Sequence, residues 1–111
     1  MYEIQHLIDG QTVASASGNT GPVFDPATGE QVGQVGLASV AEVDAAVASA
    51  RSASGEWGED SLARRTKLML EFRNLVVANA DEVAKRLTAE HGKVLDDARG
   101  EVARGIENIE F

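Results

Sequence analysis

The sequence contains no cysteine, only two prolines and a single tryptophan among its 111 residues. Without cysteine, these residues cannot supply a disulfide, a thiolate metal ligand or a cysteine nucleophile. No apolar run approaches the roughly 18 residues that indicate a membrane-spanning helix. The first residues also lack the basic start and long apolar core of a secretion signal. We therefore expect a cytoplasmic protein that makes no membrane contact.

Positive charge is scarce as well, because 10 lysines and arginines stand against 18 aspartates and glutamates, giving a net charge of −8. The basic residues are dispersed among carboxylates and form no stripe along the sequence. A clustered positive field is what attracts nucleic acids and anionic membranes. We therefore expect neither of them among the partners of this chain.

Residues 1–38 carry the patterns of strands and turns. Asp9-Gly10 is a strong hairpin signal, because this pair favours a two-residue turn. Proline and glycine within residues 25–30 predict a second tight turn. The strands that we expect around these turns are residues 4–8, 12–14, 23–24 and 31–37.

From Ser39 onward the pattern is helical. Ser39 and Glu42 fit a capping box, in which each side chain bonds a free backbone N–H of the first turn. Gly92 is placed as a helix C-cap. We expect four helices. The first begins at residue 39 and ends within residues 54–58, and the second begins at residue 60 or 61 and ends at residue 79. The third spans about residues 81–91, and the fourth runs from residue 95 to the last residue. The side chains that we expect to face inward from the first two helices are Val40, Val43, Val47, Ala50, Leu62, Met69, Phe72 and Val76. The ion pairs that we expect on the third helix are Asp81–Lys85 and Glu82–Arg86.

The last helix carries an apolar stripe at three- and four-residue spacing: Leu95, Ala98, Val102, Ile106 and Ile109. No capping signal follows it, so we expect this chain to be the front part of a larger protein. We expect the stripe to have lost its packing partner. Gly100 and Gly105 lie inside this helix, which suggests that a missing neighbour approaches closely there.

The residues alone do not assemble an active site. Neither His6 nor His91 has a serine and a carboxylate at a recognised spacing. The glycines of residues 18–21, 33–36 and 92 fit no phosphate-binding motif, so turns and helix caps are the better explanation for these glycines. The last helix also carries carboxylates that we interpret as a solvated acidic face: Asp96, Asp97, Glu107 and Glu110. The sequence therefore predicts no catalytic, cofactor-binding or metal-binding residue in this chain.

The whole chain nevertheless resembles the aldehyde dehydrogenase superfamily. Residues 90–107 (EHGKVLDDARGEVARGIE) are similar to the family's Glu-x-Gly-Lys element and the Gly-Glu-Val helix that follows it. Residues 25–30 (DPATGE) match an Asn-Pro-Ala-Thr-Gly-Glu turn, with Asp25 in place of asparagine. Further matches, in the same order along the chain, are Ile8-Asp9-Gly10, residues 41–47, Trp57 and Arg64-Arg65.

Within the superfamily the chain is most similar to the CoA-acylating methylmalonate-semialdehyde dehydrogenases. The residues that indicate this branch are Pro22-Val23-Phe24, residues 90–95 and 104–107, and Glu110-Phe111. The resemblance implies that a cysteine outside these residues forms a thiohemiacetal, which passes a hydride to NAD and leaves a thioester. Coenzyme A then resolves the thioester, and loss of carbon dioxide gives propionyl-CoA or acetyl-CoA, as in valine or inositol catabolism.

The resemblance also implies an α/β parent fold with a Rossmann-like coenzyme domain. Residues 1–111 would form the N-terminal part of its NAD-binding domain, with strands and turns at 1–38, helices at 39–111, and the rest of the domain missing. The partners would be the remaining dehydrogenase chain, a small semialdehyde and further copies in a dimer or tetramer. NAD and coenzyme A would bind the full enzyme, and we expect neither to bind these residues alone.

Three residues fall near the positions at which some family members bind a monovalent cation: Val23, Phe24 and Glu101. Glu101 replaces the usual aspartate, so we assign no metal site to them. Two alternatives to the main interpretation stay open: a hydrolytic aldehyde dehydrogenase, and a free-standing, non-catalytic helical interaction module. The chain on its own is predicted to be inactive.

Overall fold

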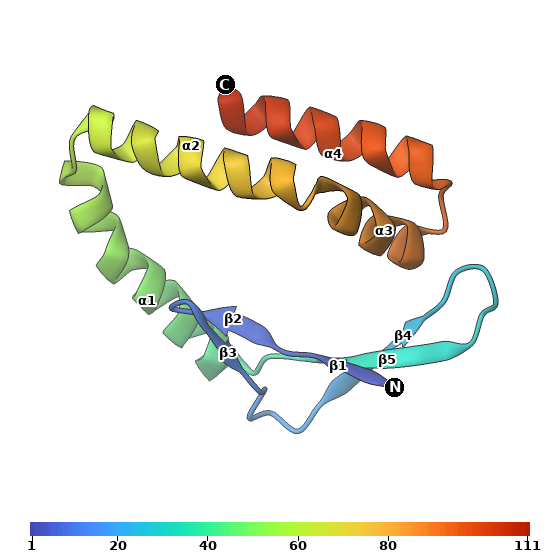
Figure 1. Cartoon of the computed structure of the whole chain (residues 1–111). Helices are drawn as coiled ribbons and strands as arrows, with labels where there is room; N and C mark the ends of the chain where they lie inside the picture. The colour runs from blue at the N-terminus through green and yellow to red at the C-terminus, as the bar shows by residue number, and fades with distance from the viewer. The chain divides into compact units, whose positions relative to one another are not determined.

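The computed structural model describes residues 1–111, which form two compact units (Figure 1). Unit 1 comprises residues 1–24 and 29–59, and unit 2 comprises residues 25–28 and 60–111. The elements in chain order are β1 (Tyr2–Ile4), β2 (His6–Ile8), β3 (Gln11–Val13), β4 (Thr20–Phe24), β5 (Gln31–Gly36), α1 (Val40–Glu59), α2 (Leu62–Ala78), α3 (Ala80–His91) and α4 (Leu95–Glu110). The expected order, strands followed by four helices, is confirmed.

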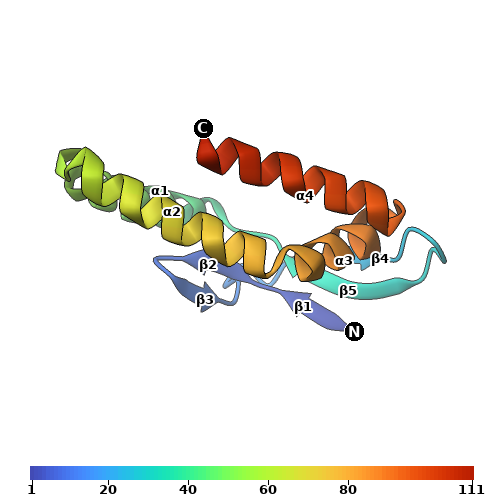
Figure 2. The ribbon, with the colours of Figure 1, turned by 45° about the horizontal axis from the view of Figure 1, so that its top comes forward.

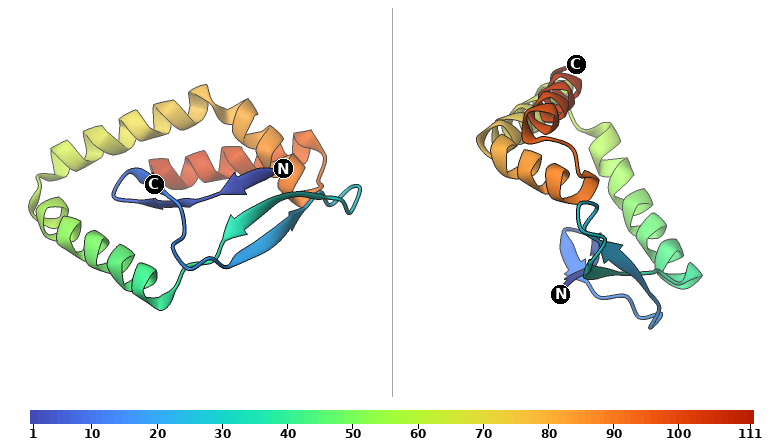
Figure 3. Two further views of the ribbon diagram at one scale, coloured as in Figure 1. Left: turned by 90° about the horizontal axis from the view of Figure 1, so that it is seen from below. Right: turned by 90° about the vertical axis from the view of Figure 1, so that its right-hand side faces the viewer.

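Unit 1 contains two small sheets (Figure 3). In the first, with strand order β1-β5-β4, β1 is parallel and β4 is antiparallel to β5. The second is the β2–β3 hairpin, in which Ile8 pairs with Gln11 across the Asp9-Gly10 turn. Asp9 and Gly10 have φ values of 52° and 70°, the positive pair that a type I′ turn requires. The predicted hairpin is confirmed.

The single strand expected at residues 4–8 is wrong, because the chain changes sheets at Gln5. Ile4 pairs with Val35 in the first sheet, whereas His6 pairs with Val13 in the second. The strand expected at residues 31–37 is confirmed as β5. Gly33 and Gly36 therefore lie inside a strand, and the interpretation of these two glycines as turn residues is wrong. A Cβ added to Gly33 would lie 2.8 Å from the backbone oxygen of Tyr2, so glycine there allows β1 to approach.

Helix α1 begins after Ser39 as the capping box predicts, but it does not end within residues 54–58. It continues to Glu59, since Gly55 and Gly58 keep negative φ and glycine weakens a helix without stopping it. No residue of α1 is buried within this chain, so the expected inward face at Val40, Val43 and Val47 is exposed. Trp57 is likewise partly exposed.

Unit 2 contains the other three helices, and its core lies between α3 and α4. Figures 1 and 2 show α4 running back alongside α3 and α2. Ala84 and Ala98 are fully buried, and Val102 is 9% exposed. Around them pack four partly buried residues: Ala80, Leu87, Leu95 and Ile106. The prediction that the α4 stripe lacks a packing partner is therefore wrong, because α3 lies against it.

The helix boundaries in unit 2 follow the capping signals. The Ser61 hydroxyl accepts a hydrogen bond from the Arg64 N–H at 3.2 Å and begins α2. Asn79 separates α2 from α3, and Gly92 ends α3 with a left-handed φ of 84°. These features confirm the predicted break and C-cap. None of the four helices combines the length and apolar character that crossing a membrane requires.

Helix α2 has no buried residue, although its sequence predicts an inward face. Leu62, Met69 and Phe72, which we expected to point inward, are 73%, 39% and 49% exposed. The reason is that the main contact of this helix is with α4, to which it is tied by Arg73 and Glu110, whose Nη2 and Oε1 atoms are 2.8 Å apart. The rest of its apolar surface is largely exposed in this chain.

Candidate functional site

Glu42, in the first turn of α1, joins three segments of unit 1. Its carboxylate accepts hydrogen bonds from the Ser39 backbone N–H and hydroxyl, both at 2.8 Å, which completes the predicted capping box. It also accepts bonds from the Ala16 N–H at 2.6 Å and the Ser15 hydroxyl at 3.3 Å. Glu42 therefore holds the loop before β4 against the start of α1.

These donors stabilise the ionised carboxylate and lower the pKa of Glu42 from 4.5 to about 2. The backbone N–H groups of Ser39 and Ala16 are the largest causes, followed by the hydroxyl of Ser39. A carboxylate held ionised by four donors is a poor proton acceptor near neutral pH. Glu42 is thus a structural anchor and not a general base.

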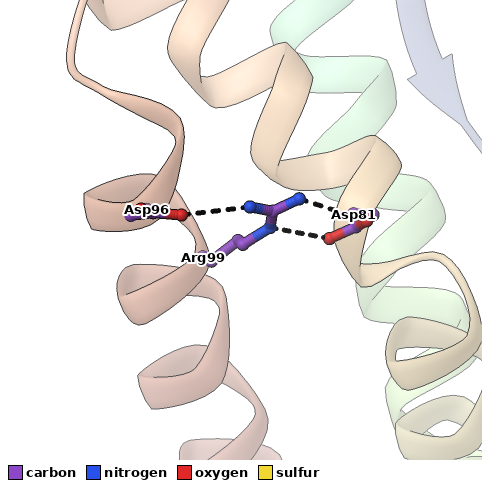
Figure 4. A network of polar contacts seen from close by, with 3 residues as sticks. All are labelled: Asp81, Asp96 and Arg99. Carbon is purple, nitrogen blue, oxygen red and sulfur yellow. Dashed lines mark hydrogen bonds and ion pairs between the residues drawn. The ribbon is translucent and has the colours of Figure 1, made fainter.

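A second polar cluster links α3 to α4 (Figure 4). The Arg99 Nε atom donates to Asp81 Oδ1 at 2.9 Å, and Nη1 donates to Asp96 Oδ1 at 3.0 Å. The Arg99 guanidinium lowers the pKa of Asp81, mainly through this hydrogen bond. The expected close ion pair of Asp81 with Lys85 does not form, because the arginine on α4 offers a two-pronged partner. The charge of Lys85 still contributes to lowering the pKa of Asp81. The other expected pair, Glu82–Arg86, is confirmed at 3.5 Å.

A polar depression of about 320 Å³ lies beside the first turns of α4. Its lining residues are Lys93, Asp96, Asp97, Gly100, Glu101 and Arg104. Lys93 is largely buried and donates to the Glu101 carboxylate, which lowers the pKa of Glu101. Three carboxylates thus face two cations, and one cation is already neutralised by its ion pair.

This depression does not fit the pyrophosphate of NAD or coenzyme A. A pyrophosphate is bound by free N–H groups or unpaired cations, whereas Asp96 and Asp97 place negative charge in the first turn of α4. The connection from β5 to α1 offers no glycine-rich loop either, since residues 37–39 are Leu-Ala-Ser.

The structure places the cation-site candidates in different units. Val23 and Phe24 lie on β4 in unit 1, and Glu101 lies on α4 in unit 2. The Glu101 carboxylate bonds the Lys93 ammonium, which occupies an oxygen that a cation would use. No group of three or more His, Asp or Glu side chains is gathered as a metal site.

A second hollow, apolar and of about 310 Å³, lies in unit 1 between the β2 strand and α1. Leu7, Val43 and Val47 supply much of its wall, and His6 lies at its edge. The Nε2 atom of His6 is buried without a hydrogen-bond partner. His91 is the last residue of α3, as expected. The two histidines lie in different units, and neither is brought beside a nucleophile pattern.

Sequence reasoning missed three of these contacts. Glu42 binds residues 26 and 27 positions away, and Arg99 binds Asp81 across two helices. The Lys93–Glu101 pair joins a loop to a helix, eight positions apart. Local spacing carries no signal for any of them. The contacts that could be recognised in advance are those at fixed local spacing, Ser39 with Glu42 and Glu82 with Arg86.

The chain belongs to the aldehyde dehydrogenase family, whose model matches residues 12–111. Among curated relatives, malonate-semialdehyde dehydrogenase 3 of Geobacillus kaustophilus (strain HTA426) is 46% identical over 108 residues, covering 97% of this chain. The malonate-semialdehyde dehydrogenase of Pseudomonas aeruginosa is 39% identical over all 111 residues. In both cases the chain spans 22% of the relative's length.

Solved structures give the same result. A candidate methylmalonate-semialdehyde dehydrogenase of Sinorhizobium meliloti 1021, complexed with NAD, matches with a TM-score of 0.96 and 46% identity. That match covers 100% of this chain and 23% of the other. The methylmalonate-semialdehyde dehydrogenase of Oceanimonas doudoroffii matches with a TM-score of 0.94 and 41% identity over 99% of this chain and 22% of its own. The aldehyde dehydrogenase fold implied by the resemblance is thereby confirmed.

Proposed function

We propose that this chain is the N-terminal part of an NAD-dependent, CoA-acylating semialdehyde dehydrogenase. The enzyme oxidises methylmalonate or malonate semialdehyde to propionyl-CoA or acetyl-CoA with loss of carbon dioxide. The observation that carries the proposal is the whole-chain similarity to proteins named for these two semialdehydes, at up to 46% identity. A succinate-semialdehyde dehydrogenase of Burkholderia pseudomallei is also similar, at 38% identity. Succinate semialdehyde is therefore the competing substrate to be tested.

In this proposal residues 1–111 belong to the NAD-binding domain and supply structure, not chemistry. Unit 2 contributes the tightly packed pair α3 and α4, held by Ala84 against Ala98 and by the Arg99–Asp81 bonds. The nucleophile and the contacts to NAD and coenzyme A come from the remaining polypeptide. The complete enzyme acts in the cytoplasm as a dimer or tetramer.

The test uses the polypeptide as its source cell makes it. Antibodies raised against residues 1–111 capture that polypeptide, its intact mass is measured, and NADH formation is followed with methylmalonate, malonate and succinate semialdehyde. We expect a mass several-fold above 11.7 kDa. We expect NADH to form with the first two substrates only when coenzyme A is present.

Two results would contradict the proposal. Oxidation to a free acid without coenzyme A would identify the hydrolytic alternative. A polypeptide of 111 residues that forms no NADH would exclude the enzyme altogether. The separately produced 111-residue chain is the control, and we expect no NAD-dependent turnover from it, because it contains no cysteine.

A further inference from the structure

Helix α2 exposes large apolar side chains on two sides. Leu68, Phe72 and Leu75, spaced four and three apart, are 52%, 49% and 63% exposed and share one side of the helix. We name these three residues the outer stripe of α2. Leu70 and Val77, seven apart, are 54% and 42% exposed and lie on another side.

The remaining two sides of α2 are accounted for. Arg73 and Val76 are half-buried on the side that faces α4, where Arg73 bonds Glu110 at 2.8 Å. Arg64, Lys67, Glu71 and Asn74 recur three or four apart and form a polar face. A helix that carries large apolar residues on two sides, in addition to the side that packs on a neighbouring helix, is typical of a helix inside a larger core. Its apolar sides therefore need partners beyond α4.

We infer that the outer stripe of α2 is an intramolecular docking surface for the part of the dehydrogenase polypeptide that lies outside these 111 residues. This inference rests on the proposed function, since it requires a longer chain. The relatives provide that length, because residues 1–111 span 22–23% of the proteins they match. An apolar, uncharged stripe on a helix needs an apolar partner, which the core of a longer chain supplies.

A second copy of this chain fits the stripe less well. A two-fold contact covers one patch on each copy, and would leave the side with Leu70 and Val77 in water. Two copies would also each bring a net charge of −8 to the contact. A longer polypeptide folding around α2 covers both sides at once.

The absence of cysteine from these residues makes the test direct. Variants L75C and K67C are made in the polypeptide as the source cell makes it, and their alkylation rates are measured by peptide mass spectrometry. Lys67 is the matched control, since it is exposed on the polar face of the same helix. We expect the L75C thiol to react at least about tenfold more slowly than the K67C thiol. After denaturation the two rates should be equal.

The separately produced 111-residue chain should alkylate both thiols rapidly, because Leu75 is exposed there. Variant L68C repeats the test on the same stripe if L75C prevents folding. Equal rates in the native polypeptide would overturn the inference, and so would protection that disappears on dilution to monomers, which identifies a second copy. A semialdehyde dehydrogenase that is active while L75C and L68C react rapidly would retain the proposed function and refute the docking surface alone.

Discussion

The contact between Ala84 and Ala98 predicts a large effect from one substitution, A98L. Both alanines are fully buried, one on α3 and one on α4, so no space next to Ala98 is open to solvent. Leucine adds three carbon atoms to a site with no room for them. Forcing extra methylenes into a packed core costs about 1–3 kcal/mol. The equilibrium for unfolding should therefore rise about 5- to 150-fold.

The matched control is A103L on the same helix. Ala103 is exposed, and leucine and alanine differ little in helix propensity, so A103L should change the free energy of unfolding by less than about 0.5 kcal/mol. Urea unfolding of the 111-residue chain, followed by circular dichroism, measures both variants. Equal midpoints for A98L and A103L would refute the close packing of α3 on α4.

Four further predictions concern single residues in the same assay. G92A should lose about 1–2 kcal/mol, because Gly92 has a φ of 84° and an added Cβ would lie 3.2 Å from Pro26 Cγ. G105A, inside α4 with open space around it, should instead gain about 0.5–1 kcal/mol. The pKa of Glu42 is lower in the folded chain than in the unfolded chain, so the ionised carboxylate stabilises the fold above about pH 4.5. This contribution is lost as the pH falls toward 2. E42Q should therefore flatten the acid side of the stability profile, and an unchanged slope would contradict the anchor role. R99M should cause only a small loss of stability, because the ion pairs of Arg99 are exposed to water. That loss should vanish in about 1 M salt, and a loss independent of salt would point to packing instead.

Those parts of the fold that depend on neighbouring residues could be predicted from the sequence. The Asp9-Gly10 turn, the Ser39 capping box and the Gly92 cap each need a residue type at a fixed local position, because backbone angles or free N–H groups demand it. The end of α1 was missed, since two glycines reduce helix propensity without blocking a hydrogen bond. Only a proline or a positive φ would have ended the helix there.

Those parts that depend on distant residues could not be predicted. The split of residues 4–8 into two strands follows from the pairing of Ile4 with Val35, thirty-one positions away. The bond from Arg99 to Asp81 likewise needs α4 to return along α3. The sequence assigned no catalytic, cofactor or metal residue to this chain, and this stays a prediction. The electrostatics of the depression beside Glu101 argue on separate grounds against phosphate binding there.

The two kinds of helix surface in unit 2 have different energetic roles. Alanine side chains allow α3 and α4 to approach closely, but each buries little apolar area, so this contact is tight without being strong. The larger side chains of the outer stripe of α2 hold more apolar area, and in this chain they stabilise little, because water still covers about half of each. Covering them would therefore add to the stability that the α3–α4 contact provides. It follows that α3 and α4 fix the local geometry of unit 2, while burial of the outer stripe would be a further source of stability in a longer polypeptide. Substitutions on the stripe should accordingly affect the full polypeptide far more than the 111-residue chain, whereas A98L should affect both.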